Sequence, residues 1–132
     1  MIPSTCHSTS LAAELRARSV VVIDDERDAV ETMVLLLQAA GHRVCGCAHA
    51  PSGLALAISR KADVVVLDYA MPFMGGGEVG RALRCHPKMF AVKIIMCSAT
   101  PEVLVRKTFW EYDLFAMKPM NVAAVLRAVA AG

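Results

Sequence analysis

Five side chains that could do chemistry follow apolar runs with the composition of buried strands. In chain order they are Asp24, Asp25, Asp68, Ser98 and Lys118. In a parallel sheet the carboxyl ends of the strands meet at one edge, so we expect three carboxylates, a hydroxyl and a cation to converge there. Carboxylates brought together raise one another's pKa values unless a cation is bound. Hard oxygen ligands with room for water favour Mg²⁺.

A metal-bound carboxylate beside a lysine and a hydroxyl can receive an anionic group. The group that suits this site is phosphoryl, because the cations neutralise its oxygens and the hydroxyl donates a hydrogen bond. We therefore interpret Asp68, in "VVVLDYAMP", as a nucleophile that forms an aspartyl phosphate.

Each of these residues also has an ordinary interpretation. An acidic pair before a helix is usually a cap, a strand-end aspartate is often a turn residue, and a lone lysine is usually solvated. Ser98 could be a cap too, but Thr100 before Pro101 is a better one, which leaves Ser98 available. The ordinary interpretation is much weaker for the whole set than for its members.

Apolar runs and helical periodicities alternate along the chain. We predict strands at 20–23, 42–48, 63–67, 92–97 and 113–117, and helices at 27–41, 52–60, 77–85, 101–110 and 121–131. This alternation predicts an α/β fold, a doubly wound five-stranded parallel sheet with helices on both faces.

Some local signals refine this pattern. Gly41 stands where a helix C′ glycine belongs. The run "GGG" at 75–77 lacks the lysine and hydroxyl residue of a phosphate loop, and we interpret it as a flexible entry into the third helix. Phe109 and Trp110 close the fourth predicted helix, where we expect core packing, with a partner-binding patch as the alternative.

Composition excludes several classes of protein. The 132 residues fit one domain, and 56% hydrophobic content with 20% charged residues is that of a folded protein. A formal net charge of +2 gives no electrostatic case for nucleic acid or an anionic membrane. The start lacks the pattern of a secretory signal, and five cysteines without a disulfide framework suggest reduced thiols, so we expect a cytoplasmic protein.

The domain motifs resemble those of the receiver domain of two-component response regulators. "LDYAMP" is similar to the family's phosphoacceptor stretch, "CSA" to its hydroxyl-bearing strand end and "FAMKP" to its lysine strand. The resemblance covers residues 19–131 and implies the flavodoxin-like strand order 2-1-3-4-5. We therefore divide the chain into an N-terminal extension at 1–18, with a short helix within 11–18, and a receiver domain at 19–132.

The resemblance also implies roles for individual residues. Asp25 would bind Mg²⁺ directly and Asp24 largely through water, Asp68 would be both ligand and phosphoacceptor, and the main-chain carbonyl of Ala70 would be a further ligand. Lys118 would contact the phosphoryl group and form a cis peptide with Pro119.

The family's switch would use Ser98 and Phe115, the ring turning inward when Ser98 moves to the phosphoryl group. Phe115 has no hydroxyl, so it would switch by packing alone. The stretch from Ser98 to Lys118 is shorter than usual for the family, and "WEYDLF" replaces the usual Gly-Ala. We therefore expect a shortened or re-angled fourth helix region, on the face that carries the family's usual dimer or partner contacts.

The function implied is that of a phospho-switch and not of an enzyme in the ordinary sense. Its partners would be a sensor histidine kinase or phosphotransfer protein and an unknown downstream protein, with no direct nucleic-acid or membrane binding and a monomeric or weakly dimeric state. Since the sequence stops at Gly132, we expect either a stand-alone regulator or an excised domain.

Two alternatives remain open at this stage. An aspartate-nucleophile phosphatase of the haloacid dehalogenase type uses Asp-x-Asp, in which the second acid is a general acid–base, but here that position is Ala70. A degenerate receiver that acts only as a phosphorylation-independent binding module is the other.

Overall fold

Residues 17–131 are described by the computed structural model, which alternates strands and helices. The strands are β1 (Ser19–Ile23), β2 (Arg43–Cys47), β3 (Val64–Asp68), β4 (Lys93–Ser98) and β5 (Leu114–Met117). The helices are α2 (Arg27–Ala39), α3 (Ala50–Arg60), α4 (Gly76–Cys85), α5 (Glu102–Val105) and α6 (Val122–Ala130). The extension predicted at 1–18 and its helix lie outside the described residues, apart from the last two positions.

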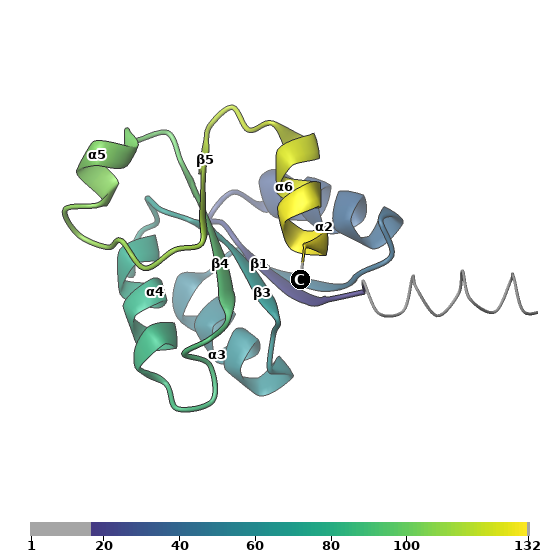
Figure 1. Cartoon of the computed structure of the whole chain (residues 1–132), viewed down its shortest axis with the longest axis horizontal. Coiled ribbons are helices and arrows are strands. Elements are labelled where there is room, and N and C mark those ends of the chain that lie inside the picture. The colour runs from purple at the N-terminus through teal and green to yellow at the C-terminus, as the bar shows by residue number, and fades with distance from the viewer. Residues whose placement is uncertain (1–16, 132) are drawn as a thin grey trace, which may run out of the picture.

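The five strands form one parallel sheet in the order β2-β1-β3-β4-β5, which confirms the predicted topology. Figure 1 shows the strands crossing the middle of the molecule with helices on both sides. In the register of β3 and β4, Asp68 lies opposite Cys97, so the last residue of β3 sits one position before the end of β4. The parallel arrangement therefore brings the ends of the strands to one edge, as the alternation predicts.

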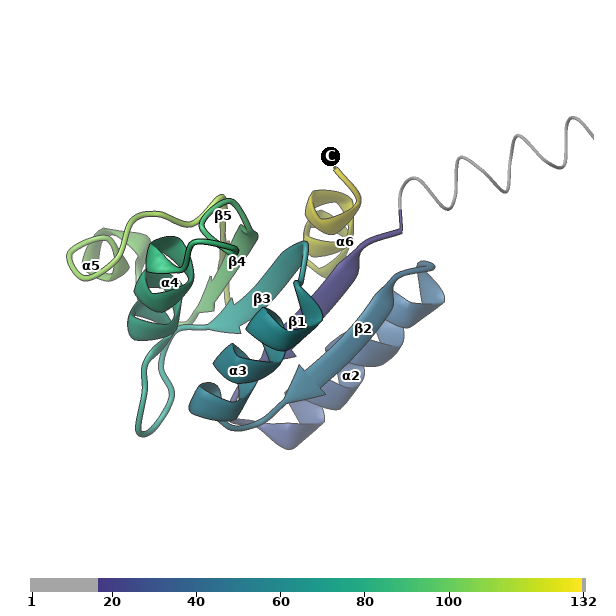
Figure 2. The ribbon, with the colours of Figure 1, turned by 90° about the horizontal axis from the view of Figure 1, so that it is seen from below.

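Alternation along the strands divides the core in two. On one face Val21, Ile23, Val65 and Leu67 pack with α3, α4 and α5, and on the other Val20, Val22, Val64 and Val66 pack with α2 and α6. Figure 2 shows α3 and α4 in front of the sheet and α2 and α6 on the other side. Because both faces are covered, β1 and β3 in the middle of the sheet are almost entirely buried and form a rigid support for their ends.

Several predicted helix boundaries hold, with local reasons. Gly41 has a φ of 97°, the left-handed conformation that favours glycine after a helix end. Asn121 caps α6, its side chain accepting a hydrogen bond from the backbone N–H of Ala124 at 3.2 Å. At the other end of α6, the Lys93 ammonium donates to the carbonyls of Ala128 and Ala131 at 2.7 and 2.9 Å. A cation at the helix C-terminus satisfies carbonyls that have no partner within the helix.

The helix predicted at 101–110 is wrong in length. Only Glu102–Val105 is helical, and the backbone N–H groups of Thr108 and Phe109 both donate to the carbonyl of Val105 in turns. The chain then extends towards β5, which agrees with the shortened region expected where the sequence departs from the family pattern. The physical reason is that Phe109 must reach the core, where its side chain is only 1% exposed.

The glycines of α4 are required for close packing. A β-carbon at Gly76 would lie 2.4 Å from the Asp68 carbonyl oxygen, and one at Gly80 would lie 2.6 Å from the Phe109 ring. The sequence predicts a flexible entry into this helix at 75–77, but the structure gives a steric reason for Gly76, which is buried in the first turn of α4. Phe109 is therefore seated directly on the backbone of α4, as predicted for a core residue, whereas Trp110 is 61% exposed.

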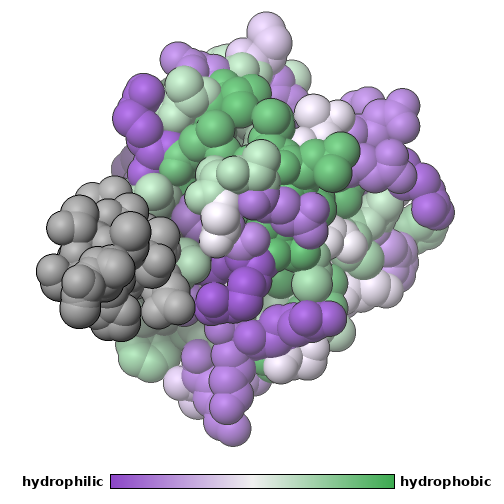
Figure 3. Space-filling model, turned by 90° about the vertical axis from the view of Figure 1, so that its right-hand side faces the viewer, coloured by the Kyte–Doolittle hydropathy of each residue, from purple (hydrophilic) through white to green (hydrophobic). Residues whose placement is uncertain are grey.

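Apolar residues are not confined to the interior. Figure 3 shows a face on which a contiguous green area of hydrophobic residues lies among hydrophilic ones. Leu35, Phe73, Phe90 and Trp110 are each more than half exposed. Among residues 17–131, however, no helix combines the length and apolarity that crossing a bilayer demands.

The packing of the Phe109 ring against α4 leads to a testable prediction. Gly80→Ala should lower the free energy of unfolding by about 1–3 kcal/mol, because the added methyl overlaps the ring and the core must shift. In a Phe109→Leu background the same change should be neutral or stabilising, since alanine favours a helix over glycine by about 1 kcal/mol. Urea denaturation of the four proteins measures both effects. Stabilisation by Gly80→Ala in the parent chain would contradict this packing.

Candidate functional site

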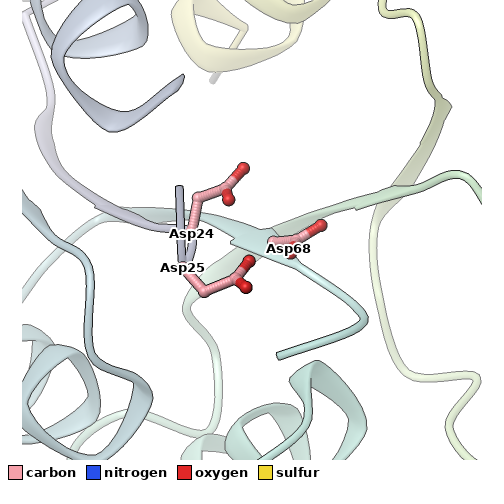
Figure 4. Close-up of side chains that lie close together, drawn as sticks. All are labelled: Asp24, Asp25 and Asp68. Carbon is pink, nitrogen blue, oxygen red and sulfur yellow. The ribbon is translucent and has the colours of Figure 1, made fainter. Parts of the chain in front are cut away.

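Three carboxylates meet where β1 and β3 end. Asp24 and Asp25 follow β1 directly, and Asp68 is the last residue of β3. One oxygen from each carboxylate lies within 4.8 Å of the others. Figure 4 shows the side chains of Asp25 and Asp68 extending into the same space, with Asp24 above them. The predicted convergence of these acids is therefore present in the structure.

Backbone hydrogen bonds fix the acidic turn after β1. The Asp24 N–H donates to the carbonyl of Cys47 at 3.3 Å, which extends the pairing of β1 with β2. The Asp24 carboxylate in turn accepts from the Glu26 N–H at 3.0 Å. Asp24 is therefore held in place and buried, whereas Asp25 is exposed to solvent. The ordinary interpretation of the acidic pair as a helix cap does not hold, because the N-cap of α2 is Glu26 and no side chain caps it. The hydrogen bond from Glu26 uses only one of the two carboxylate oxygens of Asp24.

Lys118 closes the site from the end of β5. Its ammonium group lies 2.8 Å from an Asp68 carboxylate oxygen and 3.3 Å from one of Asp24. The backbone N–H of Lys118 donates to the carbonyl of Ser98 at 2.8 Å, which positions the lysine beside the end of β4. The Lys118–Pro119 peptide is cis, as the family resemblance predicts. One cation is thus shared by two buried carboxylates.

Burial and charge shift the pKa values of this pair in a definite way. Burial raises the pKa of Asp68 to about 6, and the nearby Asp24 adds to the rise, although the Lys118 hydrogen bond opposes it. For Lys118 burial lowers the pKa, but its hydrogen bond to Asp68 and the two carboxylate charges outweigh burial, so the pKa is raised overall. Lys118 therefore remains charged at neutral pH, while a further cation would stabilise the ionised form of Asp68.

The donor set fits Mg²⁺. Three carboxylates offer hard oxygen ligands, and Asp25 is accessible to solvent, which leaves room for the waters that Mg²⁺ retains. The Cys97 thiol beside Asp68 does not compete as a ligand or nucleophile, because burial raises its pKa to about 12 and keeps it protonated.

Ser98 lies at the predicted edge of the sheet, where its hydroxyl already makes hydrogen bonds. Its side chain is buried, donates to the carbonyl of Thr100 at 2.9 Å and accepts from the Thr100 N–H at 2.8 Å. The expectation that Thr100 caps the next helix is wrong, because the N-cap residue is Pro101 and no side chain caps it. Ser98 instead closes a local turn, and its hydroxyl would have to leave that turn to reach another group.

The other predicted positions flank the site. Ala70 is exposed in the loop directly after β3, where its main chain follows Asp68 closely. Phe115 lies on β5, half buried, with its ring centroid 5.8 Å from that of Tyr112. Tyr112 also packs near Phe109 and donates a hydrogen bond to Glu102 of α5.

Sequence reasoning missed Tyr69 and Thr108. The Tyr69 hydroxyl lies 2.7 Å from the Thr108 hydroxyl across 39 residues of chain, and no sequence pattern links the two. It also missed Arg84, whose guanidinium donates to the carbonyls of Phe90 and Glu111 and pairs with Asp113 at 3.0 Å. These contacts hold the segment that replaces the longer helix.

Comparison with known proteins places the chain among signalling proteins. Residues 20–130 match the model of the response regulator receiver domain. The phosphate regulon transcriptional regulatory protein PhoB of Pseudomonas aeruginosa is 27% identical over 64% of this chain, and Protein PilH of the same organism is 29% identical over 58%. The chain spans 37% and 64% of the lengths of these two relatives.

Solved structures support the fold. The chemotaxis protein CheY4 of Vibrio cholerae superposes with a TM-score of 0.79 at 24% identity, covering 86% of this chain and 96% of that one. A response regulator receiver protein from Pseudomonas putida gives a TM-score of 0.74 at 23% identity, with 86% and 95% covered.

The raised pKa of Asp68 predicts how Mg²⁺ affinity depends on pH. The metal must displace any proton on Asp68, so affinity should fall about tenfold from pH 7 to pH 5, as the carboxylate protonates around its pKa of about 6. Calorimetric titrations with MgCl₂ between pH 5 and 8 measure this dependence. Asp25→Asn should weaken binding across the whole range and move the midpoint to lower pH, because Asp25 contributes to the raised pKa of Asp68. An affinity that stays constant from pH 7 to pH 5 would contradict the assignment of Asp68 as a ligand.

Proposed function

The chain belongs to the response regulator receiver domains of two-component signalling, and on that premise we propose that Asp68 accepts a phosphoryl group in a Mg²⁺-dependent reaction. The observation that carries this proposal is the position of the Asp68 carboxylate, buried at the end of β3 and 2.8 Å from the Lys118 ammonium, with two further carboxylates close by.

We assign the Mg²⁺ site to Asp25, Asp68 and the main-chain carbonyl of Ala70, with Asp24 acting largely through water. When bound, the ion supplies positive charge that neutralises phosphoryl oxygens. The fit rests on the cluster of carboxylates within 4.8 Å and on the exposed position of Asp25.

The transfer itself needs little from the protein beyond placement and charge. A carboxylate oxygen of Asp68 attacks the phosphorus of a phosphohistidine, a P–O bond forms, and the P–N bond breaks with its electron pair left on the imidazole. Lys118 donates to a phosphoryl oxygen in place of its ion pair with Asp68. Hydrolysis by water later returns the carboxylate and inorganic phosphate.

The switch follows from the same positions. Ser98 would exchange its hydrogen bonds with Thr100 for one to the phosphoryl group, and Phe115 would then move inward against its neighbours. Since Phe115 lacks a hydroxyl, its altered packing beside Tyr112 would carry the change to the face formed by α5, β5 and α6.

The donor we propose is a sensor histidine kinase or a phosphotransfer protein, and the receiver of the signal is a downstream protein. A cytoplasmic location suits these partners. Direct nucleic-acid binding is not expected of this chain, and a monomer or weak homodimer remains the prediction for its assembly. The phosphatase alternative has no acid–base residue at position 70, where this chain has alanine.

Phosphorylation by a small donor tests the proposal. Incubation with Mg²⁺ and acetyl phosphate or phosphoramidate should add one phosphoryl group to the protein, and intact-mass spectrometry should detect it. Asp68→Asn should abolish the adduct, because an amide is not a nucleophile here. Asp63 lies directly before the first residue of β3. Asp63→Asn is the matched control and should be modified like the parent chain.

Failure would take one of two forms. An equal adduct in Asp68→Asn would remove Asp68 from its role. No adduct in the parent chain would favour the phosphorylation-independent binding module.

A further inference from the structure

Tyr69 connects the phosphoacceptor strand to the segment after α5. Its hydroxyl lies 2.7 Å from the Thr108 hydroxyl. Thr108 already donates its single hydroxyl proton to the carbonyl of Val105 at 3.0 Å, so Tyr69 is the donor of the shared hydrogen bond. Both residues line a cleft of about 350 Å³ beside the start of α4.

The backbone of Tyr69 is tied to the site. Its N–H donates to the carbonyl of Cys97 at 2.9 Å, and its carbonyl accepts from the N–H of Gly76 at 2.7 Å. Its peptide neighbours are Asp68, the proposed acceptor, and Ala70, the proposed source of a carbonyl ligand. A change in how the site is occupied therefore acts on the residues to either side of Tyr69.

The far end of the link is also well anchored. Arg81 of α4 donates to the carbonyl of Thr108, and the Phe109 ring rests on Gly80. The next residue is Trp110, the one tryptophan of the chain, with 61% of its surface exposed. The segment 106–110 thus has an interior side fixed to α4 and an exposed side that can report its position.

A second route reaches the same segment from β4. Ser98 is bonded to Thr100, and the short α5 begins almost at once, at Glu102. Because so little chain lies between them, a displacement of Ser98 would act on the start of α5, which leads directly into the turn at Thr108. In the present arrangement Ser98 is bonded to Thr100 and Lys118 to Asp68, so the Tyr69–Thr108 bond belongs to the unmodified form.

We propose that the hydrogen bond from Tyr69 to Thr108 restrains the segment 106–110 in the unmodified form and opposes the switch, so that occupancy of Asp68 and release of this segment are linked. The inference rests on the proposed function. It follows from linkage that a restraint present in only one state must lower the affinity for any ligand that favours the other state.

Beryllofluoride, a phosphoryl mimic, tests this with the full chain and Mg²⁺. Calorimetry gives its affinity, and Trp110 emission reports the segment. Tyr69→Phe and Thr108→Val should each tighten binding about three- to tenfold. The double variant should gain no more than Thr108→Val alone, because Tyr69→Phe removes no further bond once the Thr108 hydroxyl is gone, whereas Thr108→Val also removes the bond to the Val105 carbonyl. The emission of free Tyr69→Phe should already be displaced towards that of the parent complex. Ser59→Ala, which removes a hydroxyl on α3 that donates only to Leu56, is the control and should change neither.

The possible outcomes distinguish failure of the proposed restraint from failure of the proposed function. Three results would overturn the restraint while leaving the proposed function intact. They are unchanged or weakened beryllofluoride affinity in the single variants, additive gains in the double variant, and Trp110 emission of the parent chain that does not change when beryllofluoride binds. Absence of Mg²⁺-dependent beryllofluoride binding in the parent chain would overturn the proposed function, and the inference with it.

Discussion

The burial of a carboxylate at the end of a rigid strand is the constraint on which the rest of the structure depends. Asp68 is 6% exposed and shares the single ammonium of Lys118 with Asp24, so negative charge in the site exceeds its positive charge. Desolvation makes that imbalance costly, and the raised pKa of Asp68 expresses the cost. The site is therefore best satisfied by a further cation. The buried strand β3 fixes the position of the Asp68 carboxylate that would bind it.

The scaffold around this carboxylate has little freedom. β3 is buried along its whole length, and Gly76 brings α4 against the carbonyl of Asp68, where any side chain would collide. The same helix receives Phe109 on Gly80, so the segment that follows the short α5 is packed against α4. A closely packed element of this kind changes between discrete arrangements more readily than it deforms continuously. Under the proposed function, that property would carry a small change at Asp68 to a distant surface.

Much of this arrangement could be predicted from the sequence because strands and helices with strong periodicity specify their own faces. The alternation of apolar runs and helical periodicities at 20–131 predicts the parallel sheet. The residues after each strand predict the converging acids and Lys118. The predicted helix at 101–110 failed because Phe109 is drawn into α4, a tertiary contact that local periodicity does not contain. Thr100 is not the cap because the N-cap position of α5 falls one residue later, on Pro101. The contact between Tyr69 and Thr108 could not be predicted for a similar reason, because only the fold brings the two residues together.

The most direct test of the central claim is to locate the modified atom. An aspartyl phosphate is an acyl phosphate, and borohydride reduces its carbonyl carbon to an alcohol, which converts the aspartate to homoserine. After incubation with Mg²⁺ and acetyl phosphate, reduction with borodeuteride, proteolysis and peptide mass spectrometry should find deuterated homoserine at position 68, and none when Mg²⁺ is replaced by a chelator. Label at Asp24, Asp25 or another carboxylate, or none at position 68, would contradict the account.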